Sequence, residues 1–261
     1  MGFSCKVVSA LVVAALAYWA YDVVYGEVNT NQMLIAGFRN RATNAKAMRD
    51  FAARFYGEDG QAMLDGKTIL VTGTTSGLGE GIAAHIYEAA PASATLVLPV
   101  RSAKKHPVDA VEERLSVLGA LQRSEFAADS KRPAGHPKVV VVQQDLSDLD
   151  SIDKSVQELK TAGIVVDVLI NNAGLAPINW QLTKQGFDVA MGVNHFGTAH
   201  LTLQLNEQGL LSHGPLKSST RGRVVMVSSE EHRLPKHRFD DSSQPAFGSA
   251  VEHGMGGAME R

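Results

Sequence analysis

The chain has 261 residues, of which 44% are hydrophobic and 20% charged, a composition typical of a globular protein rather than a disordered one. Its formal net charge of −2 lacks the basic excess of most nucleic-acid-binding proteins, so we expect no nucleic acid and a small-molecule partner. The single cysteine, Cys5, excludes an intrachain disulfide framework and a cysteine zinc site, and it favours a reducing compartment.

Residues 1–30 contain an uncharged apolar run between Lys6 and Asp22. The 15 residues of this run are fewer than the roughly 20 that usually span a bilayer, and they also suit the core of a signal peptide. Three interpretations remain open: a membrane anchor, which we favour, a cleaved signal, or a buried soluble helix. Aromatic residues suited to a membrane interface support the anchor, namely Tyr18, Trp19, Tyr21 and Tyr25.

Residues 31–64 carry apolar positions at helical spacing with basic residues between them, which predicts a basic amphipathic helical segment. This segment either packs on the domain that follows or rests on an anionic membrane surface. Under the positive-inside rule its basic residues favour a domain that faces the cytosol, although Lys6 and the amino terminus oppose that orientation.

A domain is expected over residues 65–232, where strand-like runs alternate with helix-length segments. The runs are 68–72, 95–100, 139–142, 166–170 and 223–227. This alternation predicts an α/β fold with a doubly wound parallel sheet. Ser147 is expected to cap the helix that begins near Leu149, and the polar residues 119–138 are expected to form an inserted loop.

The segment 72–79, with the sequence TGTTSGLG, joins the first strand-like run to an amphipathic helical pattern. Glycines allow a sharp turn, and the free N–H groups and positive dipole end of the following helix attract an anion. The flanking strand and helix therefore predict a pyrophosphate-binding turn. The residues expected at the cofactor are Thr72, Gly73, Thr75, Ser76, Gly77, Leu78 and Gly79.

Four further motifs follow this turn: DL at 145–146, NNAG at 171–174, VNHFG at 193–197 and VSS at 227–229. Their order and spacing resemble those of the short-chain dehydrogenase/reductase family, over about residues 65–232. The glycine spacing is similar to that of the classical branch, and residues 193–202 and 229–232 are most similar to membrane-associated, retinol-dehydrogenase-like members. The resemblance implies a Rossmann-like fold and a small lipophilic alcohol or carbonyl substrate. It also implies a membrane-associated location, at the endoplasmic reticulum or another organelle.

The resemblance implies cofactor contacts beyond the glycine turn. Arg101 ends the second strand, where a basic side chain would accept the 2′-phosphate of NADP, so NADP is favoured over NAD; a solvated arginine is the alternative. Asp145, followed by Leu146, resembles the family residue near the adenine ring, although it also suits a helix cap. The NNAG turn would both stabilise the sheet and line the cofactor through Asn172, Ala173 and Gly174.

The resemblance also implies a partial catalytic set. Ser229 would hydrogen-bond the reacting oxygen, with Ser228 as the alternative, and Asn194 would hold a water linked to the catalytic lysine. An asparagine inside a helix is otherwise unfavourable. His195 and His200 would lie on different helix faces, so no metal site is expected.

The family's acid/base motif, Tyr-x-x-x-Lys, does not occur in the 261 residues. The sequence ends 32 residues after Ser229, about where members with a longer substrate loop carry that motif. We therefore expect a C-terminally incomplete fold, with an incomplete substrate loop or disordered tail over residues 233–261. Such a fragment would be poorly soluble and nearly inactive. The alternative is a noncatalytic nucleotide-binding or membrane-associated scaffold protein. The oligomeric state is not predicted.

Overall fold

The computed structural model describes residues 50, 52, 54–126, 133–177, 179–212 and 222–228. The predictions for residues 1–30, for the greater part of 31–64 and for 233–261 lie outside this range. Among the described residues, no helix combines the length and the apolar character needed to cross a bilayer.

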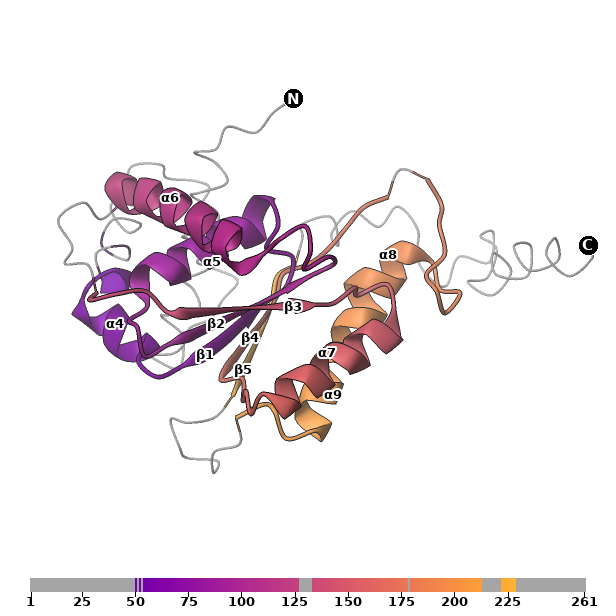
Figure 1. Ribbon diagram of the computed structural model, residues 1–261. Helices are drawn as coiled ribbons and strands as arrows, with labels where there is room; N and C mark the ends of the chain where they lie inside the picture. Colours follow the sequence, from indigo (N-terminus) through magenta and orange to yellow (C-terminus); the bar gives the residue numbers. More distant parts are fainter. Residues whose placement is uncertain are drawn as a thin grey trace, which may run out of the picture. The chain divides into compact units, whose positions relative to one another are not determined.

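Five parallel strands form one sheet, in the order β3-β2-β1-β4-β5 (Figure 1). The strands are β1 (Thr68–Val71), β2 (Thr95–Val100), β3 (Lys138–Gln143), β4 (Val168–Asn171) and β5 (Arg223–Met226). All five strand-like runs of the sequence are thus strands, with bounds that differ from the predicted ones by at most two residues. The strand order reverses at β1, which pairs with β2 on one side and β4 on the other. In open α/β sheets, ligands bind at the carboxyl ends of the strands beside such a reversal.

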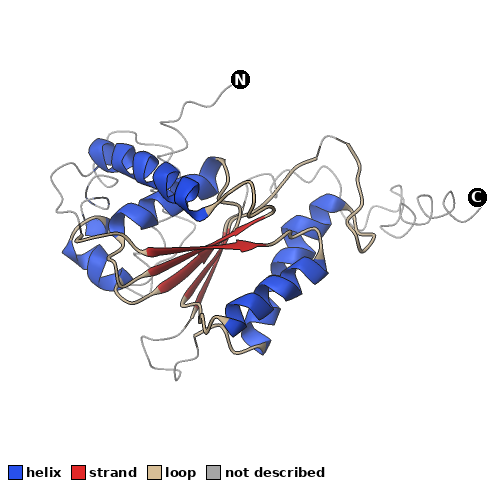
Figure 2. Ribbon diagram, in the orientation of Figure 1, coloured by secondary structure: helices blue, strands red, loops and turns tan. Residues whose placement is uncertain are grey.

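Helices cover both faces of the sheet (Figure 2). One face carries α4 (Glu58–Leu64), α5 (Gly77–Ala89) and α6 (Val108–Phe126). The other carries α7 (Leu149–Thr161), α8 (Val189–Met191), the π-helix η1 (Gly192–Gly197) and α9 (Thr198–Glu207). This arrangement confirms the predicted doubly wound, Rossmann-like α/β fold.

The central strand β1 contributes side chains to two separate cores. Ile69 and Val71 pack into the core beneath α5 and α6, whereas Leu70 packs into the core beneath α7 and α9. Successive side chains of a strand point to opposite faces, so a strand covered on both faces needs apolar residues at every position. The run Ile-Leu-Val is therefore continuous rather than alternating.

The prediction of a loop over residues 119–138 is wrong in its first part, because α6 continues to Phe126. The polar composition of this part of α6 does not follow exposure, because Leu121 is 62% exposed whereas Gln122 is buried. The helix packs closely on α5: a Cβ at Gly119 would lie 2.7 Å from the carbonyl oxygen of Ala84. The glycine thus allows close helix contact rather than a turn.

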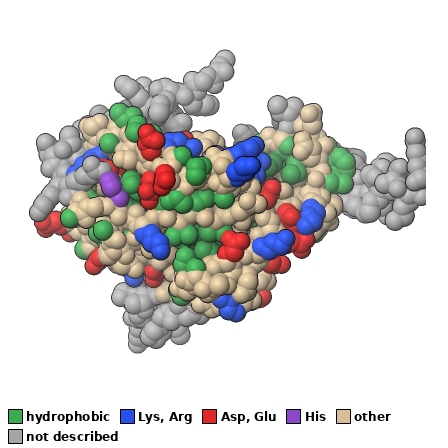
Figure 3. Space-filling model, in the orientation of Figure 1, with side chains coloured by type: hydrophobic (Ala, Val, Ile, Leu, Met, Phe, Trp, Pro, Cys, Tyr) green, Lys and Arg blue, Asp and Glu red, His purple; other side chains and the backbone are tan. Residues whose placement is uncertain are grey.

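The core extends upstream of residue 65, where the sequence suggested that the domain begins. Ala52, Phe55, Tyr56 and Leu64 are buried in the same core as β1 and α5. These four side chains thus pack on the domain, while residues 31–49, which carry most of the basic side chains of the segment, lie outside the described part of the chain. On the face drawn in Figure 3, acidic and basic side chains are interspersed.

Candidate cofactor-binding site

The glycine turn between β1 and α5 has the backbone conformation that its sequence predicts. Gly73 and Gly77 adopt φ angles of 71° and 65°, in the left-handed region that side chains disfavour. Gly79 lies in the first turn of α5, where a Cβ would be 2.2 Å from the carbonyl oxygen of Gly73 and 2.3 Å from Nδ2 of Asn172. The positive φ angle thus favours glycine at Gly73 and Gly77, and the lack of space requires it at Gly79. The turn leads directly into the amino end of a 13-residue helix.

Thr72 ties the end of β1 to the turn that follows β4. Its Oγ1 accepts hydrogen bonds from the backbone N–H groups of Asn172 and Ala173, both at 3.0 Å. Asn172 returns a hydrogen bond from Nδ2 to the carbonyl oxygen of Thr72, at 2.9 Å. The glycine turn and the NNAG turn are thus one cross-linked unit, in which Thr72 and Asn172 hold the backbone in place.

The remaining predicted residues of the turn differ in exposure. Ser76 is the exposed N-cap residue of α5, and its hydroxyl makes no capping hydrogen bond. Thr75 is partly buried, and Leu78 packs against the core beneath α5. Leu78 can therefore face a ligand through its backbone only, whereas the Ser76 hydroxyl is accessible.

Arg114, on α6, supports the turn from the side and was not predicted from the sequence. Its Nε lies 2.7 Å from Oε1 of Glu80, in the first turn of α5, and its guanidinium lies 3.5 Å from the carbonyl oxygen of Thr74. No spacing rule connects a residue to a turn 40 positions earlier in the chain. Only the contact between α5 and α6 brings the two together.

Arg101 is placed as predicted, directly after the last residue of β2, and it is exposed. Within the part of the chain that the structure describes, no acidic side chain pairs with it. Its guanidinium is therefore accessible at the same edge of the sheet as the glycine turn.

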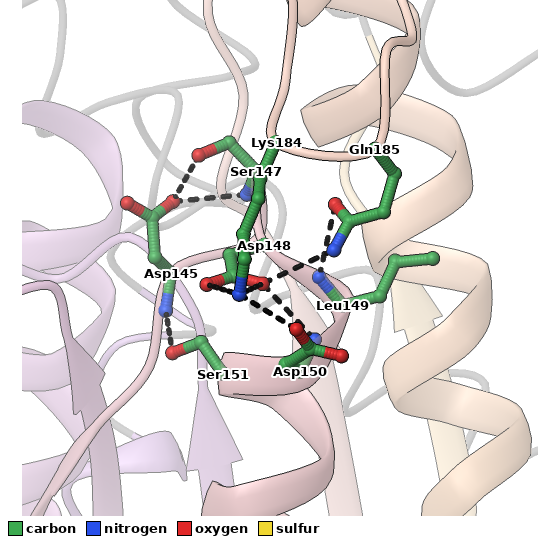
Figure 4. Close-up of polar contacts among 8 residues, drawn as sticks. All are labelled: Asp145, Ser147, Asp148, Leu149, Asp150, Ser151, Lys184 and Gln185. Atoms are coloured by element: carbon green, nitrogen blue, oxygen red, sulfur yellow. Dashed lines mark hydrogen bonds and ion pairs between the residues drawn. The ribbon is translucent and has the colours of Figure 1, made fainter.

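Asp145 lies after β3 in a tight turn (Figure 4). Its Oδ1 accepts hydrogen bonds from the backbone N–H and the hydroxyl of Ser147, at 2.9 and 2.7 Å. Ser147 is thus not the N-cap of α7, as the sequence suggested. Asp148 takes that position, with its carboxylate accepting from the N–H of Asp150 at 3.1 Å. An ionised carboxylate is as good a cap as a hydroxyl and also complements the helix dipole.

Leu146 packs inward from the same turn and is 8% exposed. Its carbonyl oxygen lies against Gly197, at the end of η1, where a Cβ would come within 2.1 Å. The turn that carries Asp145 is therefore held against the helix that carries Asn194.

Asn194 lies in η1 and clamps the loop that follows the NNAG turn. Its Oδ1 accepts from the N–H of Leu175 at 2.9 Å, and its Nδ2 donates to the carbonyl oxygen of Leu175 at 2.8 Å. Gly174, which precedes Leu175, is exposed. The two backbone hydrogen bonds explain why asparagine is tolerated here, and π-helical turns of this kind often occur at functional sites.

Of the predicted reactive residues, Ser229 lies outside the described part of the chain, and Ser228 is exposed. His200 pairs with Asp153 of α7 at 2.7 Å, whereas His195 contacts the ring of Phe196. Within the residues that the structure describes, no three His, Cys, Asp or Glu side chains are grouped closely enough to hold a metal ion.

A parallel sheet with a reversal at β1, helices on both faces and a glycine turn at the reversal define a Rossmann-type α/β domain. The family model described as short chain dehydrogenase matches residues 67–239. The chain therefore belongs to the short-chain dehydrogenase family, which confirms the resemblance inferred from its motifs.

Among curated proteins, human retinol dehydrogenase 14 is 32% identical over 179 residues, which cover 69% of this chain and 49% of the relative. Mouse retinol dehydrogenase 12 is 32% identical over 192 residues, covering 73% and 52%. This chain is thus of the retinol-dehydrogenase-like type and spans about half the length of these relatives. A solved structure of a Brucella melitensis 3-oxoacyl-[acyl-carrier protein] reductase in complex with NAD is 26% identical. Its TM-score is 0.42, with 62% of this chain and 55% of that chain covered.

Proposed function

We propose that this chain is the cofactor-binding part of an NADP-dependent oxidoreductase that acts on the alcohol/carbonyl pair of a small lipophilic compound. The observation that carries this proposal is the lack of space for a Cβ at Gly79, combined with positive φ angles at Gly73 and Gly77. Such a backbone can approach a pyrophosphate closely at the amino end of α5. The names of the retinol dehydrogenase relatives support a lipophilic alcohol as the substrate class.

The residues at this edge of the sheet fit a dinucleotide. The exposed Arg101 suits the 2′-phosphate. Oδ2 of Asp145, which accepts no hydrogen bond from the described residues, suits the amino group of adenine. Bound NADP(H) would supply or accept the hydride. The chain's own residues would bind and orient it, and Ser229 would hydrogen-bond the reacting oxygen. We further propose that residues 1–30 attach the protein to a membrane, at the endoplasmic reticulum or another organelle, with the domain on the cytosolic side.

Replacing Arg101 by alanine is expected to weaken NADPH binding by about 10- to 100-fold and to leave NADH binding within about 2-fold. A charge-assisted contact to phosphate contributes about 1.5–3 kcal/mol, and only NADPH carries the 2′-phosphate. Isothermal titration calorimetry at one fixed ionic strength measures both affinities. Lys138→Ala, at the amino end of β3, removes a positive charge away from the site and serves as the control. Equal affinity of the unaltered chain for NADPH and NADH would contradict the preference for NADP.

The purified 261-residue chain is expected to bind NADPH but to reduce a retinoid aldehyde at least ~100-fold more slowly than a full-length relative, because general acid catalysis contributes about 10²–10⁴. Tyr56 and Tyr87, the tyrosines that the structure describes, are both buried. Among the described residues β5 pairs only with β4, and its Val224 and Met226 are exposed. An exposed apolar edge strand favours aggregation, so the assay is carried out in detergent.

Rapid, NADPH-dependent reduction of the aldehyde by this chain would contradict the expected lack of an acid/base group. Failure to bind either dinucleotide would instead contradict the proposed function itself and favour a scaffold protein.

A further inference from the structure

We propose that Lys184 and Gln185 are positioning residues for the adenosine half of the cofactor. They fasten the turn over residues 181–188, between β4 and α8, onto the first turn of α7. That helix start in turn fixes the position of Asp145. The inference rests on the proposed function and adds to it two residues that lie outside the five motifs described above.

Lys184 binds two carboxylates at the start of α7 (Figure 4). Its Nζ lies 2.6 Å from Oδ2 of Asp150 and 3.2 and 3.3 Å from the two carboxylate oxygens of Asp148. The hydrogen bonds to Asp150 and Asp148 raise the pKa of Lys184. For Asp148, burial acts to raise the pKa, but the hydrogen bonds from Gln185 and Lys184 outweigh it and hold the pKa below its usual value. Both groups are therefore charged at neutral pH.

Gln185 adds a second attachment beside the first. Its Oε1 accepts from the N–H of Leu149 at 3.4 Å, and its Nε2 donates to Oδ1 of Asp148 at 3.2 Å. The first N–H groups of a helix have no partner within the helix. Gln185 thus supplies one of the missing acceptors from a segment 36 residues further along the chain.

The turn that presents these two side chains is itself well ordered by hydrogen bonds. Thr183 is 8% exposed, and its N–H donates to the carbonyl oxygen of Phe187 at 2.8 Å. The N–H of Phe187 donates to Oγ1 of Thr183 at 3.1 Å, and Gly186 adopts a φ angle of 82°. Lys184 and Gln185 therefore project from a fixed backbone rather than from a free loop.

Asp148 connects this attachment to Asp145. The N–H of Asp148 donates to the carbonyl oxygen of Asp145 at 3.1 Å, and the N–H of Asp145 donates to the hydroxyl of Ser151, in the first turn of α7, at 3.0 Å. A shift of the helix start would therefore shift the carboxylate of Asp145. The side chain of Lys184 is 56% exposed, and ion pairs this exposed contribute only about 0–1 kcal/mol to folding. Loss of the pair should therefore affect ligand affinity more than stability.

The test compares Lys184→Met with Lys184→Arg in the full 261-residue chain. Lys154→Met, on the exposed face of α7, is the matched control. Lys184→Met is expected to weaken binding of 2′,5′-ADP and of NADPH by about 3- to 10-fold. Lys184→Arg should restore both affinities to within about 2-fold, and Lys154→Met should leave both unchanged. The melting temperature of Lys184→Met should remain within about 2 °C of that of the unaltered chain. Calorimetry gives the affinities and thermal denaturation the melting temperatures.

A double-mutant cycle with Asp150→Asn adds a readout that a general structural effect would not produce. The losses of affinity from Lys184→Met and Asp150→Asn should be less than additive, because both changes break the same contact. Unchanged affinity for 2′,5′-ADP in Lys184→Met would overturn the inference. So would a loss that occurs only together with a lower melting temperature. If the unaltered chain binds neither NADPH nor 2′,5′-ADP, the proposed function fails and this inference fails with it.

Discussion

Gly79→Ala is expected to abolish measurable dinucleotide binding, with a loss of affinity of at least ~100-fold, or about 2.7 kcal/mol. The added methyl group would lie 2.2 Å from the carbonyl oxygen of Gly73 and 2.3 Å from Nδ2 of Asn172. The first contact is with backbone, and Asn172 is held by its hydrogen bond to Thr72, so neither neighbour can move without opening the turn. The distorted turn would no longer direct its N–H groups at a pyrophosphate.

The measurement is NADPH affinity, by calorimetry or by the change in cofactor fluorescence, together with a denaturation curve. Overpacking of this kind also destabilises a fold by about 1–3 kcal/mol, so a control must separate misfolding from loss of the site. Gly163→Ala provides it. Gly163 follows α7 with a φ angle of 67° and has open space around its Cβ position, so alanine adds backbone strain away from the site. We expect Gly163→Ala to lose stability and retain NADPH binding. Unaltered NADPH affinity in Gly79→Ala would refute the placement of the pyrophosphate.

The sheet could be predicted from the sequence because each strand has a simple physical signature. A parallel strand covered on both faces is a short, continuous apolar run, and Ile69, Leu70 and Val71 supply side chains to both cores in turn. The extent of α6 could not be predicted in the same way. Its second half combines polar residues with Gly119, a composition that loops share, and only the close approach to α5 distinguishes the two.

The glycine turn could also be predicted, since its residues are contiguous and each glycine has a local steric role. The residues that hold the site in place from other elements could not be predicted from the sequence. Arg114 reaches the turn from α6, and Lys184 reaches Asp148 across 36 positions of sequence. Both depend on how elements pack rather than on spacing along the chain. The error at Ser147 has a related origin, since two adjacent residues could each cap α7 and the competing hydrogen bond to Asp145 decides between them.

A buried histidine of α5 should make the chain less stable at mildly acidic pH than at neutral pH. His85 is 1% exposed, and burial lowers its pKa to about 3. Its Nδ1 forms a hydrogen bond with the hydroxyl of Tyr56, and its Nε2 is buried without a partner among the described residues. The nearby Glu88 and Arg123 already pair with each other, at 3.6 Å. A proton added to His85 would therefore create a buried cation whose second N–H has no acceptor among the described residues.

The direction of the effect follows from the two pKa values. The pKa of His85 is about 3 in the folded state and about 6.5 in the unfolded state, so the unfolded chain takes up the proton first as the pH falls. The contribution of neutral His85 to the stability of the folded state is complete above about pH 6.5, and it is lost progressively as the pH decreases towards 3. Within this window, each decrease of one pH unit lowers the free energy of unfolding by about 1.4 kcal/mol. Between pH 7 and pH 5 the free energy of unfolding therefore falls by about 2 kcal/mol.

Urea denaturation at pH 7 and pH 5 measures this difference, and His85→Gln is the variant that isolates it. Glutamine retains a polar group opposite Tyr56 but cannot be protonated in this range. The variant should be less stable than the unaltered chain at pH 7, yet should lose at least about 1.5 kcal/mol less between pH 7 and pH 5. Burial raises the pKa of Tyr56, so its hydroxyl stays protonated at both pH values and does not contribute to the difference. An equal loss of stability in the two proteins would show that acid sensitivity arises from other groups, because only His85 has been removed from the titration.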